Sequence, residues 1–425
     1  MKETPYWWIT APDWPAYADT PLPQRADVVV IGSGYTGLSA ARRLAKSGAS
    51  VAVLEKETIG WGASSRNGGQ VLSGLKLGVQ TLIARYGLEA ARRLFRAATQ
   101  SVDYLEDLIQ EESIACEFAR WGNLDAASKP KHFEDFQRTR EVLARDFDCH
   151  CEIVPRREQH REIGTHAYYG LMIDPHSAAL NPAQYVRGLA RAAERAGAAL
   201  FDKTPAMSIK RIGSGFEVKT RRGSIKAGAV FVATNGYTDA AAPDLRRRVV
   251  PIGSYIIATE PLREDVAGRL LPKRRVVSDS RNFLHYYRLS SDNRVLFGGR
   301  AEFVPPTPDS NRKSAETLRR DMAQVFPELG GVGVEYAWSG NVCFTRDMLP
   351  HAGCFDNGVY YAAGYGGHGV AMATYLGALM ADVVLGQDDR NPFREYKFGA
   401  IPLYDGRPWF LPLAAAWYKL LDWIQ

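Results

Sequence analysis

Six residues near the start of the chain form a glycine-rich segment of the kind that binds phosphate groups. The segment is Gly32-Ser33-Gly34-Tyr35-Thr36-Gly37, a G-x-G-x-x-G pattern that follows the apolar run 26–31 and opens a helical pattern. The first glycine permits a tight turn, the second lets backbone approach a pyrophosphate, and the third lets the helix pack closely on the strand. The N–H groups at the start of the helix attract phosphate. This spacing therefore indicates dinucleotide binding.

Glu55 supplies the second half of this pattern. It follows the apolar run 50–54, where an acidic side chain can accept hydrogen bonds from a ribose diol. An NADP site would prefer arginine or lysine at this position, so Glu55 argues against NADP. The two apolar runs and the helical pattern between them predict one βαβ unit. The motif by itself does not distinguish FAD from NAD.

The segment after Glu55 resembles a known family of flavoenzymes. Residues 62–70 read Gly-Ala-Ser-Ser-Arg-Asn-Gly-Gly-Gln. This segment is similar to the FAD-dependent amine and amino-acid oxidoreductases, which include D-amino acid oxidase, glycine oxidase and sarcosine oxidase. It is most similar to the gamma-glutamylputrescine oxidase branch. The resemblance extends over essentially the whole chain through the segments 286–289, 292–294, 338–341 and 365–370, and it implies FAD as the cofactor.

The resemblance also implies a flavin site with two sides. One side is the first glycine-rich turn together with residues 62–70, here called the serine-rich segment. The other side is a second glycine-rich turn, residues 366–370, at the start of a helix whose dipole would point at the flavin. The residues implied to bind FAD are Gly32, Gly34, Tyr35, Thr36, Gly37, Glu55, Lys56, Ser64, Ser65, Arg66, Asn67, Gly68, Gly69, Gln70, Ala206, Thr234, Asn235, Gly236, Gly366, Gly367, His368, Gly369 and Val370.

The mode of flavin attachment is judged from one motif. Relatives of the sarcosine oxidase type attach FAD to a cysteine that lies five residues before the threonine of a T-x-D motif. Here the motif is 345–347 and the corresponding residue is Gly340, whereas Cys343 is out of register. We therefore expect non-covalent FAD, with Cys343 as a buried strand thiol.

The resemblance implies oxidation of an amine C–N bond, with hydride transfer to flavin N5, hydrolysis of the imine, and reduction of O2 to H2O2. Aromatic walls would lower the amine pKa by desolvation. Strand alternation puts His285 and Tyr287 on one face and Tyr286 and Arg288 on the other, so only one pair can face a pocket. The candidate catalytic residues are Tyr255, His285, Tyr287, Trp338, Tyr365 and His368.

The class of substrate is indicated by the lack of an arginine shortly after the serine-rich segment. Sarcosine-type oxidases bind the substrate carboxylate through an arginine a few residues beyond the serine-rich turn, near Ser73 here, but no arginine occurs between Gln70 and Ala84. This favours an amine, polyamine or gamma-glutamylated amine, while secondary amines and cyclic imino acids stay open. A dehydrogenase of the same fold that delivers electrons to a quinone or a carrier protein is the alternative. A flavin-binding protein without turnover is a third reading.

The order of elements predicts a mixed α/β fold, with a Rossmann-type FAD-binding domain interleaved with an antiparallel-sheet substrate domain, as in glutathione reductase and D-amino acid oxidase. Residues 79–147 are helical in pattern, and residues 250–300 alternate as strands do. We assign 1–90, 151–245 and 335–400 to the FAD-binding domain, 91–150 and 246–334 to the substrate domain, and 401–425 to an apolar tail.

Composition limits the other partners. The net charge is +6 and the basic clusters are short, so nucleic acid is not expected. No metal site is expected, because the five cysteines form no ligand pattern. Unpaired thiols and the lack of a secretory signal indicate the cytoplasm. The tail 401–425 could contact a membrane surface or pack on the protein itself, and the oligomeric state is not predicted.

Overall fold

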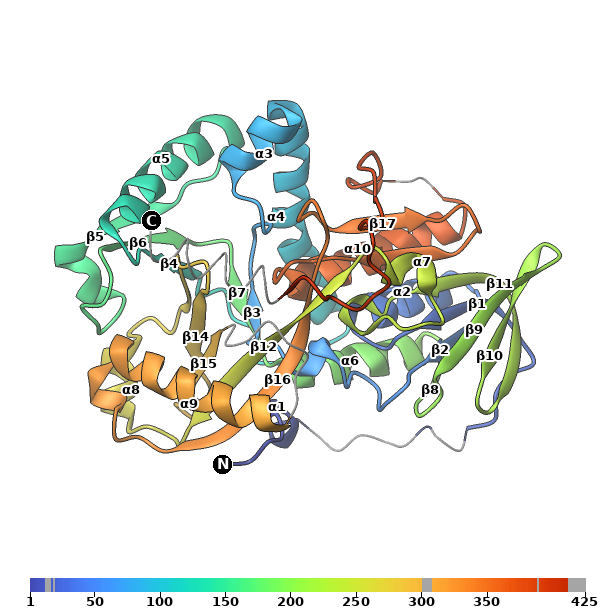
Figure 1. Ribbon diagram of the computed structural model, residues 1–425, viewed down its shortest axis with the longest axis horizontal. Coiled ribbons are helices and arrows are strands. Elements are labelled where there is room, and N and C mark those ends of the chain that lie inside the picture. The colour runs from blue at the N-terminus through green and yellow to red at the C-terminus, as the bar shows by residue number, and fades with distance from the viewer. Residues whose placement is uncertain (12–16, 18–19, 300–307, 388–389, 412–425) are drawn as a thin grey trace.

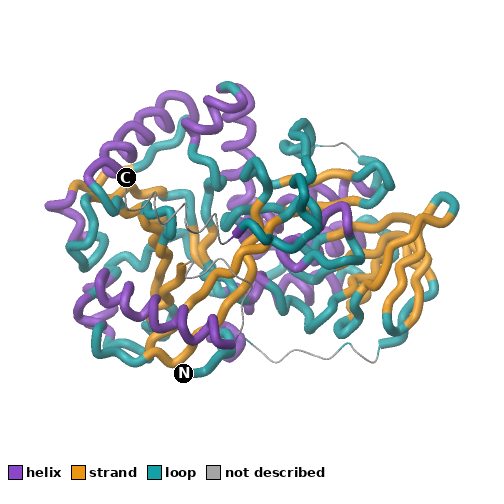
Figure 2. The backbone as a smooth tube through the Cα atoms, in the orientation of Figure 1, coloured by secondary structure: helices purple, strands orange, loops and turns teal. Residues whose placement is uncertain are grey.

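Two eight-stranded sheets form the framework of the protein (Figure 1). The structure is a computed structural model, and it describes residues 1–11, 17, 20–299, 308–387 and 390–411. The two sheets lie toward opposite ends of the long axis in Figure 2, with helices around and between them. The mixed α/β fold predicted from the order of elements is confirmed.

The first sheet contains the βαβ unit. Its strands follow the order β17-β18-β11-β1-β2-β8, with β10 and β9 extending it from β11. The pairs β1–β11, β1–β2, β2–β8 and β11–β18 are parallel, and their apolar residues are buried on both faces, as the continuous apolar runs predict. The strands are β1 (Arg25–Ile31), β2 (Val51–Leu54), β8 (Ala199–Phe201), β9 (Ala206–Ile212), β10 (Gly215–Thr220), β11 (Gly223–Val232), β17 (His351–Cys354) and β18 (Tyr360–Ala363).

Helices cover this sheet and enclose the largest core. Helix α2 packs on α10 and α6, and α10 also packs on α4. The Ser39 Oγ donates to the backbone O of Thr374 at 2.7 Å, which ties α2 to α10. The helices are α2 (Tyr35–Lys46), α4 (Leu88–Glu111), α6 (Pro182–Arg195) and α10 (Gly369–Val384).

The second sheet is mostly antiparallel and follows the order β16-β12-β15-β14-β13-β4-β6-β5. Helix α9 packs on β12, β15 and β16, while α5 packs on β5 and β6 at the other end of the sheet. The strands are β4 (Asn123–Ala126), β5 (Glu152–Pro155), β6 (Gly170–Asp174), β12 (Val250–Thr259), β13 (Val276–Asp279), β14 (His285–Leu289), β15 (Val295–Gly299) and β16 (Val334–Phe344).

Shorter elements join the two sheets. A two-stranded pair, β3 with β7, lies between them. The remaining elements are α1 (Tyr6–Ile9), β3 (Gln70–Val71), α3 (Val79–Tyr86), α5 (Pro130–Phe147), β7 (Ala178–Ala179), α7 (Pro243–Arg246), α8 (Glu264–Leu270) and α9 (Pro308–Val325), with the 3-10 helices η1 (Ala63–Ser65), η2 (Arg156–Arg161), η3 (Asn235–Tyr237) and η4 (Pro327–Leu329).

Sheet membership differs from the predicted ranges at three places. Strands β5 and β6 belong to the second sheet because they pair with each other and β6 also pairs with β4. Strand β16 also belongs there because it pairs along β12 from Val250–Phe344 to Thr259–Val334. The predicted helical region 79–147 is interrupted by β4, which β13 and β6 complete from distant parts of the chain.

Within the described residues, we find no helix that is both long and apolar enough to cross a membrane. Most of the predicted apolar tail, residues 412–425, lies outside the described residues.

Candidate active site

The first glycine-rich turn connects β1 to α2 and leaves no room for side chains. A Cβ at Gly37 would lie 1.9 Å from the backbone O of Gly32, and a Cβ at Gly34 would lie 2.9 Å from the Ser64 Oγ. Gly34 is also the N-cap residue of α2, so the first N–H groups of that helix open toward the turn. The lack of side chains at Gly34 and Gly37 lets a phosphate approach the backbone at the start of α2, although the Ser33 and Tyr35 N–H groups already donate within the protein.

A cavity of about 360 Å³ lies over this turn. It is formed by six separate segments: the β1–α2 turn, the residues after β2, the start of β9, the residues after β11, residues 341–343 of β16, and the turn before α10 with the start of that helix. The predicted FAD-binding residues that line it are Gly32, Gly34, Tyr35, Thr36, Glu55, Lys56, Ser64, Asn67, Ala206, Thr234, Asn235, Gly366, Gly367, Gly369 and Val370.

Glu55 is fixed at the edge of this cavity. Its Oε2 accepts hydrogen bonds from the Ser33 backbone N at 3.0 Å and from the Ser33 Oγ at 2.6 Å, while its Oε1 accepts from the Glu57 backbone N at 2.9 Å. Each carboxylate oxygen retains lone-pair capacity. The carboxylate can therefore accept further donors, such as a ribose diol, without giving up the bonds that orient it.

The second glycine-rich turn lies between β18 and α10 and meets the first turn directly. The Tyr365 hydroxyl and the Thr36 Oγ1 are 2.7 Å apart, and both side chains are buried. The Asn235 Oδ1 accepts from the Gly364 backbone N at 2.9 Å, so the end of β11 is tied to the same turn. Helix α10 begins at Gly369, which lines the cavity, so the positive N-terminal end of this helix also borders the cavity.

The serine-rich segment is held rigidly between the two sheets. The Ser64 Oγ accepts from the Tyr35 backbone N at 3.0 Å, and the Asn67 Oδ1 accepts from the Gly69 backbone N at 2.8 Å. From the second sheet, the Trp338 Nε1 donates to the backbone O of Arg66 at 2.8 Å. Trp338 is thus buried behind the segment and supports it.

Residues 1–11, here called the N-terminal arm, support the serine-rich segment from another side. The Trp7 Nε1 donates to the backbone O of Asn67 at 2.8 Å, and the Trp8 Nε1 donates to the Ser65 Oγ at 3.0 Å. Aromatic side chains of this arm are buried: Tyr6 and Trp7 are only 2% and 1% exposed and form part of α1. The partner of this arm lies some sixty residues away in the chain, so composition alone could not reveal it.

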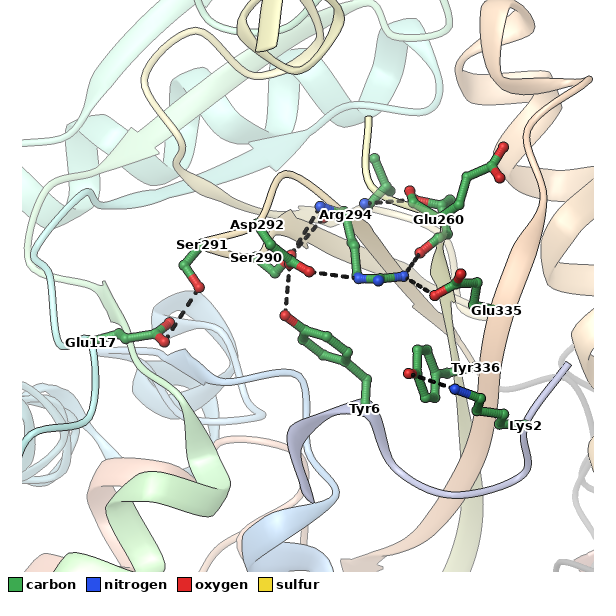
Figure 3. A network of polar contacts seen from close by, with 12 residues as sticks. Lys2, Tyr6, Glu117, Glu260, Ser290, Ser291, Asp292, Arg294, Glu335 and Tyr336 are labelled. Carbon is green, nitrogen blue, oxygen red and sulfur yellow. Dashed lines mark hydrogen bonds and ion pairs between the residues drawn. The ribbon is translucent and has the colours of Figure 1, made fainter. Parts of the chain in front are cut away.

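A polar network anchors the arm to the second sheet (Figure 3). The Tyr6 hydroxyl donates to the Asp292 Oδ1 at 2.6 Å. Arg294 forms ion pairs with Asp292 at 2.7 Å and with Glu335 at 2.5 Å. Close by, the Lys2 Nζ donates to the Tyr336 hydroxyl at 3.3 Å. The arm therefore connects the second sheet to the serine-rich segment.

A second cavity, of about 450 Å³, adjoins the first. One face of the second sheet forms part of its wall, through Ser254, Ile256, Ser278 and Tyr286. The Tyr286 ring lies against the serine-rich segment, because a Cβ at Gly68 would be 3.0 Å from it. The two cavities adjoin at a junction whose residues line both of them: Ala63, Asn67, Asn341, Val342, Gly366, Gly367 and Val370.

Three of the predicted catalytic residues lie on the other face of the second sheet, away from both cavities. The Tyr287 ring stacks on Phe297 and its hydroxyl donates to Tyr168 at 2.9 Å, while the Tyr255 hydroxyl donates to Ser310 of α9 at 3.1 Å. Helix α9 packs on that face, and this places Tyr286 of the alternative pair at the cavity.

His285 lies in an ion network on the same far face. Its Nδ1 and Nε2 are each 3.1 Å from a carboxylate, of Asp279 and Asp321 respectively. Burial lowers the pKa of His285, but the hydrogen bonds to the two carboxylates outweigh it and raise the pKa to about 9. The contact between His285 and Asp321 connects the sheet to α9. His285 itself lies outside the residues that line the cavities.

Two other predicted catalytic residues do reach the cavities. Tyr365 lines the first and His368 lines the second. The His368 Nδ1 is buried without a hydrogen-bond partner, and burial lowers the pKa of the ring to about 4. An unpartnered polar atom at the junction is an open position for a ligand atom.

The other predicted residues are spread around this junction. Arg66, Gly68 and Gln70 line the second cavity, and the Gln70 Nε2 donates to the backbone O of Val277 at 3.1 Å. The backbone O of Gly69 accepts from Arg288 at 2.9 Å, so this arginine supports the segment and does not face a ligand. Gly236 lies beneath the junction, where its backbone O accepts from the Asn341 Nδ2 at 3.1 Å.

The site fits a flavin dinucleotide. Two helix N-termini and two glycine-rich turns border the first cavity, and the adjoining second cavity contains the unpartnered His368 nitrogen. Cys343 lines the first cavity, but burial raises the pKa of its thiol to about 12, so it is not a thiolate.

Comparisons with known proteins agree with this geometry. The family model described as FAD dependent oxidoreductase, DAO, matches residues 27–383. Gamma-glutamylputrescine oxidoreductase of Escherichia coli strain K12 is 33% identical over 403 residues, which cover 93% of this chain and 92% of that protein. The probable oxidoreductase OrdL of Haemophilus influenzae is 33% identical over 408 residues, which cover 94% and 92% of the two chains.

A solved structure has the same fold. Glycine oxidase from Geobacillus kaustophilus superimposes with a TM-score of 0.75 at 22% identity, covering 89% of this chain and 99% of that one. The overall fold is therefore shared with this protein of known structure.

Proposed function

Because the chain belongs to the DAO family of FAD-dependent oxidoreductases, we propose that it oxidises the terminal amine of a gamma-glutamylated amine or polyamine. The enzyme is an FAD-dependent oxidoreductase that acts on amines or amino acids. The observation that carries the finer proposal is the second cavity, which opens from the flavin junction and is walled by Tyr286, Ile256 and Leu284.

The proposed overall reaction converts the amine, water and O2 into an aldehyde, ammonia and H2O2. Bound FAD supplies the electron acceptor, at N5 of its ring. The protein's own contribution is binding and desolvation. The side chains of Tyr286 and Ile256 exclude water from the junction, and this lowers the pKa of a bound amine and favours its neutral, reactive form.

The choice of substrate rests on the charges around the cavity. Arg66 lines it, but this guanidinium donates to the backbone O of Trp61 at 2.8 Å and lies over the rings of Trp8 and Trp61. Burial lowers its pKa, and its hydrogen bonds serve the serine-rich segment. This arrangement favours a substrate whose reacting carbon carries no carboxylate, in line with the name of the relative from Escherichia coli.

We further propose that FAD is bound without a covalent link and that the protein acts in the cytoplasm. Residue 340 is a glycine and the Cys343 thiol is buried and protonated. Denaturing the holoenzyme in acid and separating protein from supernatant tests the first point. Release of all yellow colour supports it, whereas colour retained by the polypeptide contradicts it.

The electron acceptor is tested by stoichiometry. The purified holoenzyme is supplied with gamma-glutamylputrescine in air, and O2 consumption and H2O2 release are measured together. Equal amounts of the two support the oxidase. Turnover that requires an added quinone and gives no H2O2 supports the dehydrogenase of the same fold.

A further inference from the structure

The wall of the second cavity changes from aromatic to acidic across the second sheet. Neighbouring strands align Tyr286 with Ser278, and Ser278 with Asp125. All three residues line the cavity, together with Asn123 on β4 and Asp174 on β6. The end away from the flavin junction therefore contains two carboxylates and an amide, beside Cys149, Cys151 and Met172.

Neither carboxylate has a basic partner among the residues that the structure describes. Within the part of the chain that the structure describes, the one hydrogen bond to the Asp125 side chain comes from the Asn123 Nδ2, at 3.0 Å. Asp174 accepts from the Ser73 Oγ at 2.7 Å, from the Ser177 Oγ, and from the His176 backbone N at 2.9 Å. These neutral donors orient Asp174 but do not neutralise its charge.

A second observation points to a ligand at this position. Asn123 is 5% exposed, and its Oδ1 is buried without a hydrogen-bond partner. A buried amide oxygen that accepts no bond costs free energy, and such groups are rare unless a ligand or water completes them. The Asn123 oxygen and the two carboxylates are all acceptors, so together they suit a donor that carries positive charge.

We propose that Asp125, Asp174 and Asn123 bind a second, distal ammonium group of the substrate and thereby select amines that carry two separated cations. This inference rests on the proposed amine oxidation and names the substrate class more narrowly. Asp125 and Asp174 act in specificity and do not touch the reacting atoms.

The spacing of the strands sets the length of the preferred substrate. Tyr286 and Asp125 are two strands apart, and adjacent strands are about 4.8 Å apart, so the acidic end is about 10 Å from the aromatic end. An extended chain advances about 1.2 Å per bond, which gives about eight bonds between the reacting carbon and the distal nitrogen. A four-carbon diamine is too short, whereas a gamma-glutamylated diamine carries its α-ammonium at about this distance.

Electrostatics give the site its affinity. Burial, with the neighbouring charge of Asp174, raises the pKa of Asp125 to about 7. A bound ammonium would offset the cost of keeping both carboxylates charged in an enclosed cavity. Above pH 7 the free protein therefore holds Asp125 as a carboxylate beside Asp174, and a bound ammonium would favour this charged form.

The test compares two probes of equal length on the holoenzyme at pH 8, without air. Octylamine carries one ammonium and 1,8-diaminooctane carries two, so the pair isolates the distal charge. Binding is read from the rise in melting temperature with probe concentration, which requires no turnover. Flavin bleaching is recorded separately in the same samples.

We expect 1,8-diaminooctane to bind at least about tenfold more tightly than octylamine. The Asp125→Asn variant should reduce that advantage to less than about twofold while leaving the affinity for octylamine unchanged. The matched control is Asp148→Asn, because Asp148 is fully exposed and forms no part of the cavity. It removes the same charge and should retain the full advantage.

Equal binding of the two probes by the unaltered enzyme would overturn the inference, as would an advantage that survives in Asp125→Asn. Asp174→Asn is a second variant that should also lose the advantage. Failure of the proposed function has a different signature. In that case neither probe bleaches the flavin, while the difference in binding between the probes still decides whether the distal site exists.

Discussion

The Tyr365 hydroxyl lies 2.7 Å from the Thr36 Oγ1, although the two residues are 329 positions apart in the chain. Thr36 belongs to the turn that opens α2, and Tyr365 belongs to the turn that opens α10. One hydrogen bond thus joins the two glycine-rich turns, and both helix N-termini are directed at one cavity because the turns are joined.

Removing this bond should weaken FAD binding. In Tyr365→Phe the Thr36 hydroxyl loses its partner in a buried position, at a cost of about 1–3 kcal/mol. We expect the dissociation constant of FAD, measured by fluorescence titration of the apoprotein, to rise up to about tenfold. The matched control is Tyr361→Phe on the preceding strand β18, whose ring stacks on Phe355 outside the cavity. Equal effects of the two variants would contradict this role.

The N-terminal arm should matter for flavin retention. Trp7→Phe keeps an aromatic ring but removes the Nε1 donor to the backbone O of Asn67. Because that carbonyl belongs to the serine-rich segment, we expect FAD to dissociate several-fold faster from the variant, as measured by recovery of free flavin fluorescence on dilution. Trp409→Phe, at an exposed tryptophan, should match the unaltered protein. An unchanged dissociation rate in Trp7→Phe would show that the arm does not position the segment.

The local part of the site could be predicted from the sequence, whereas the long-range part could not. The turn Gly32–Gly37, Glu55 and the second turn are encoded within short segments, and they line one cavity. Strand alternation correctly separated His285 and Tyr287 from Tyr286 but could not choose the face. That choice depends on α9, which packs on the face opposite the cavity.

The acidic end of the cavity escaped prediction for a related reason. Asp125 lies in a region whose pattern is helical on both sides, and it becomes part of a strand only through pairing with β13 and β6. Asp174 comes from a hairpin assigned by sequence to the other domain. The acidic pair is created by tertiary contacts and has no local signature.

His368 should make the protein sensitive to mild acid. Burial lowers the pKa of the folded ring to about 4, whereas an unfolded histidine protonates near pH 6.5. The unfolded state therefore binds more protons between these values, and stability falls as the pH drops from about 6.5 to about 4. In His368→Gln the melting temperature should fall less over this interval. The exposed control His150→Gln should follow the unaltered protein, and a His368→Gln curve parallel to it would contradict the assignment.

Asp125 should have the opposite dependence on pH. It shares the second cavity with Asp174 on β6, Cys149 and Cys151 before β5, Asp279 on β13 and Lys76. Its folded pKa of about 7 lies above its usual 3.8 because of burial and the charge of Asp174. The folded state therefore retains a proton that the unfolded state has lost, and stability falls as the pH rises from about 4 to about 7.

Asp125→Asn removes this loss, so the variant should be more stable than the unaltered protein at pH 8, by the order of 1–3 kcal/mol, and similar at pH 4. The measurement is the melting temperature of both holoenzymes at each pH. A purely structural aspartate would give the reverse result, with the variant less stable at pH 8. Higher stability combined with weaker binding of the distal cation is the combined signature of a binding residue.

The central claim is that this flavoenzyme removes hydride from the terminal carbon of an extended, cationic amine. It is tested most directly by mixing the holoenzyme with gamma-glutamylputrescine without air and following the visible flavin absorption. We predict rapid, complete bleaching at a rate that saturates with substrate concentration and that exceeds the rate given by sarcosine or proline. A spectrum that gamma-glutamylputrescine leaves unchanged, while sarcosine or proline bleaches it, would contradict the claim.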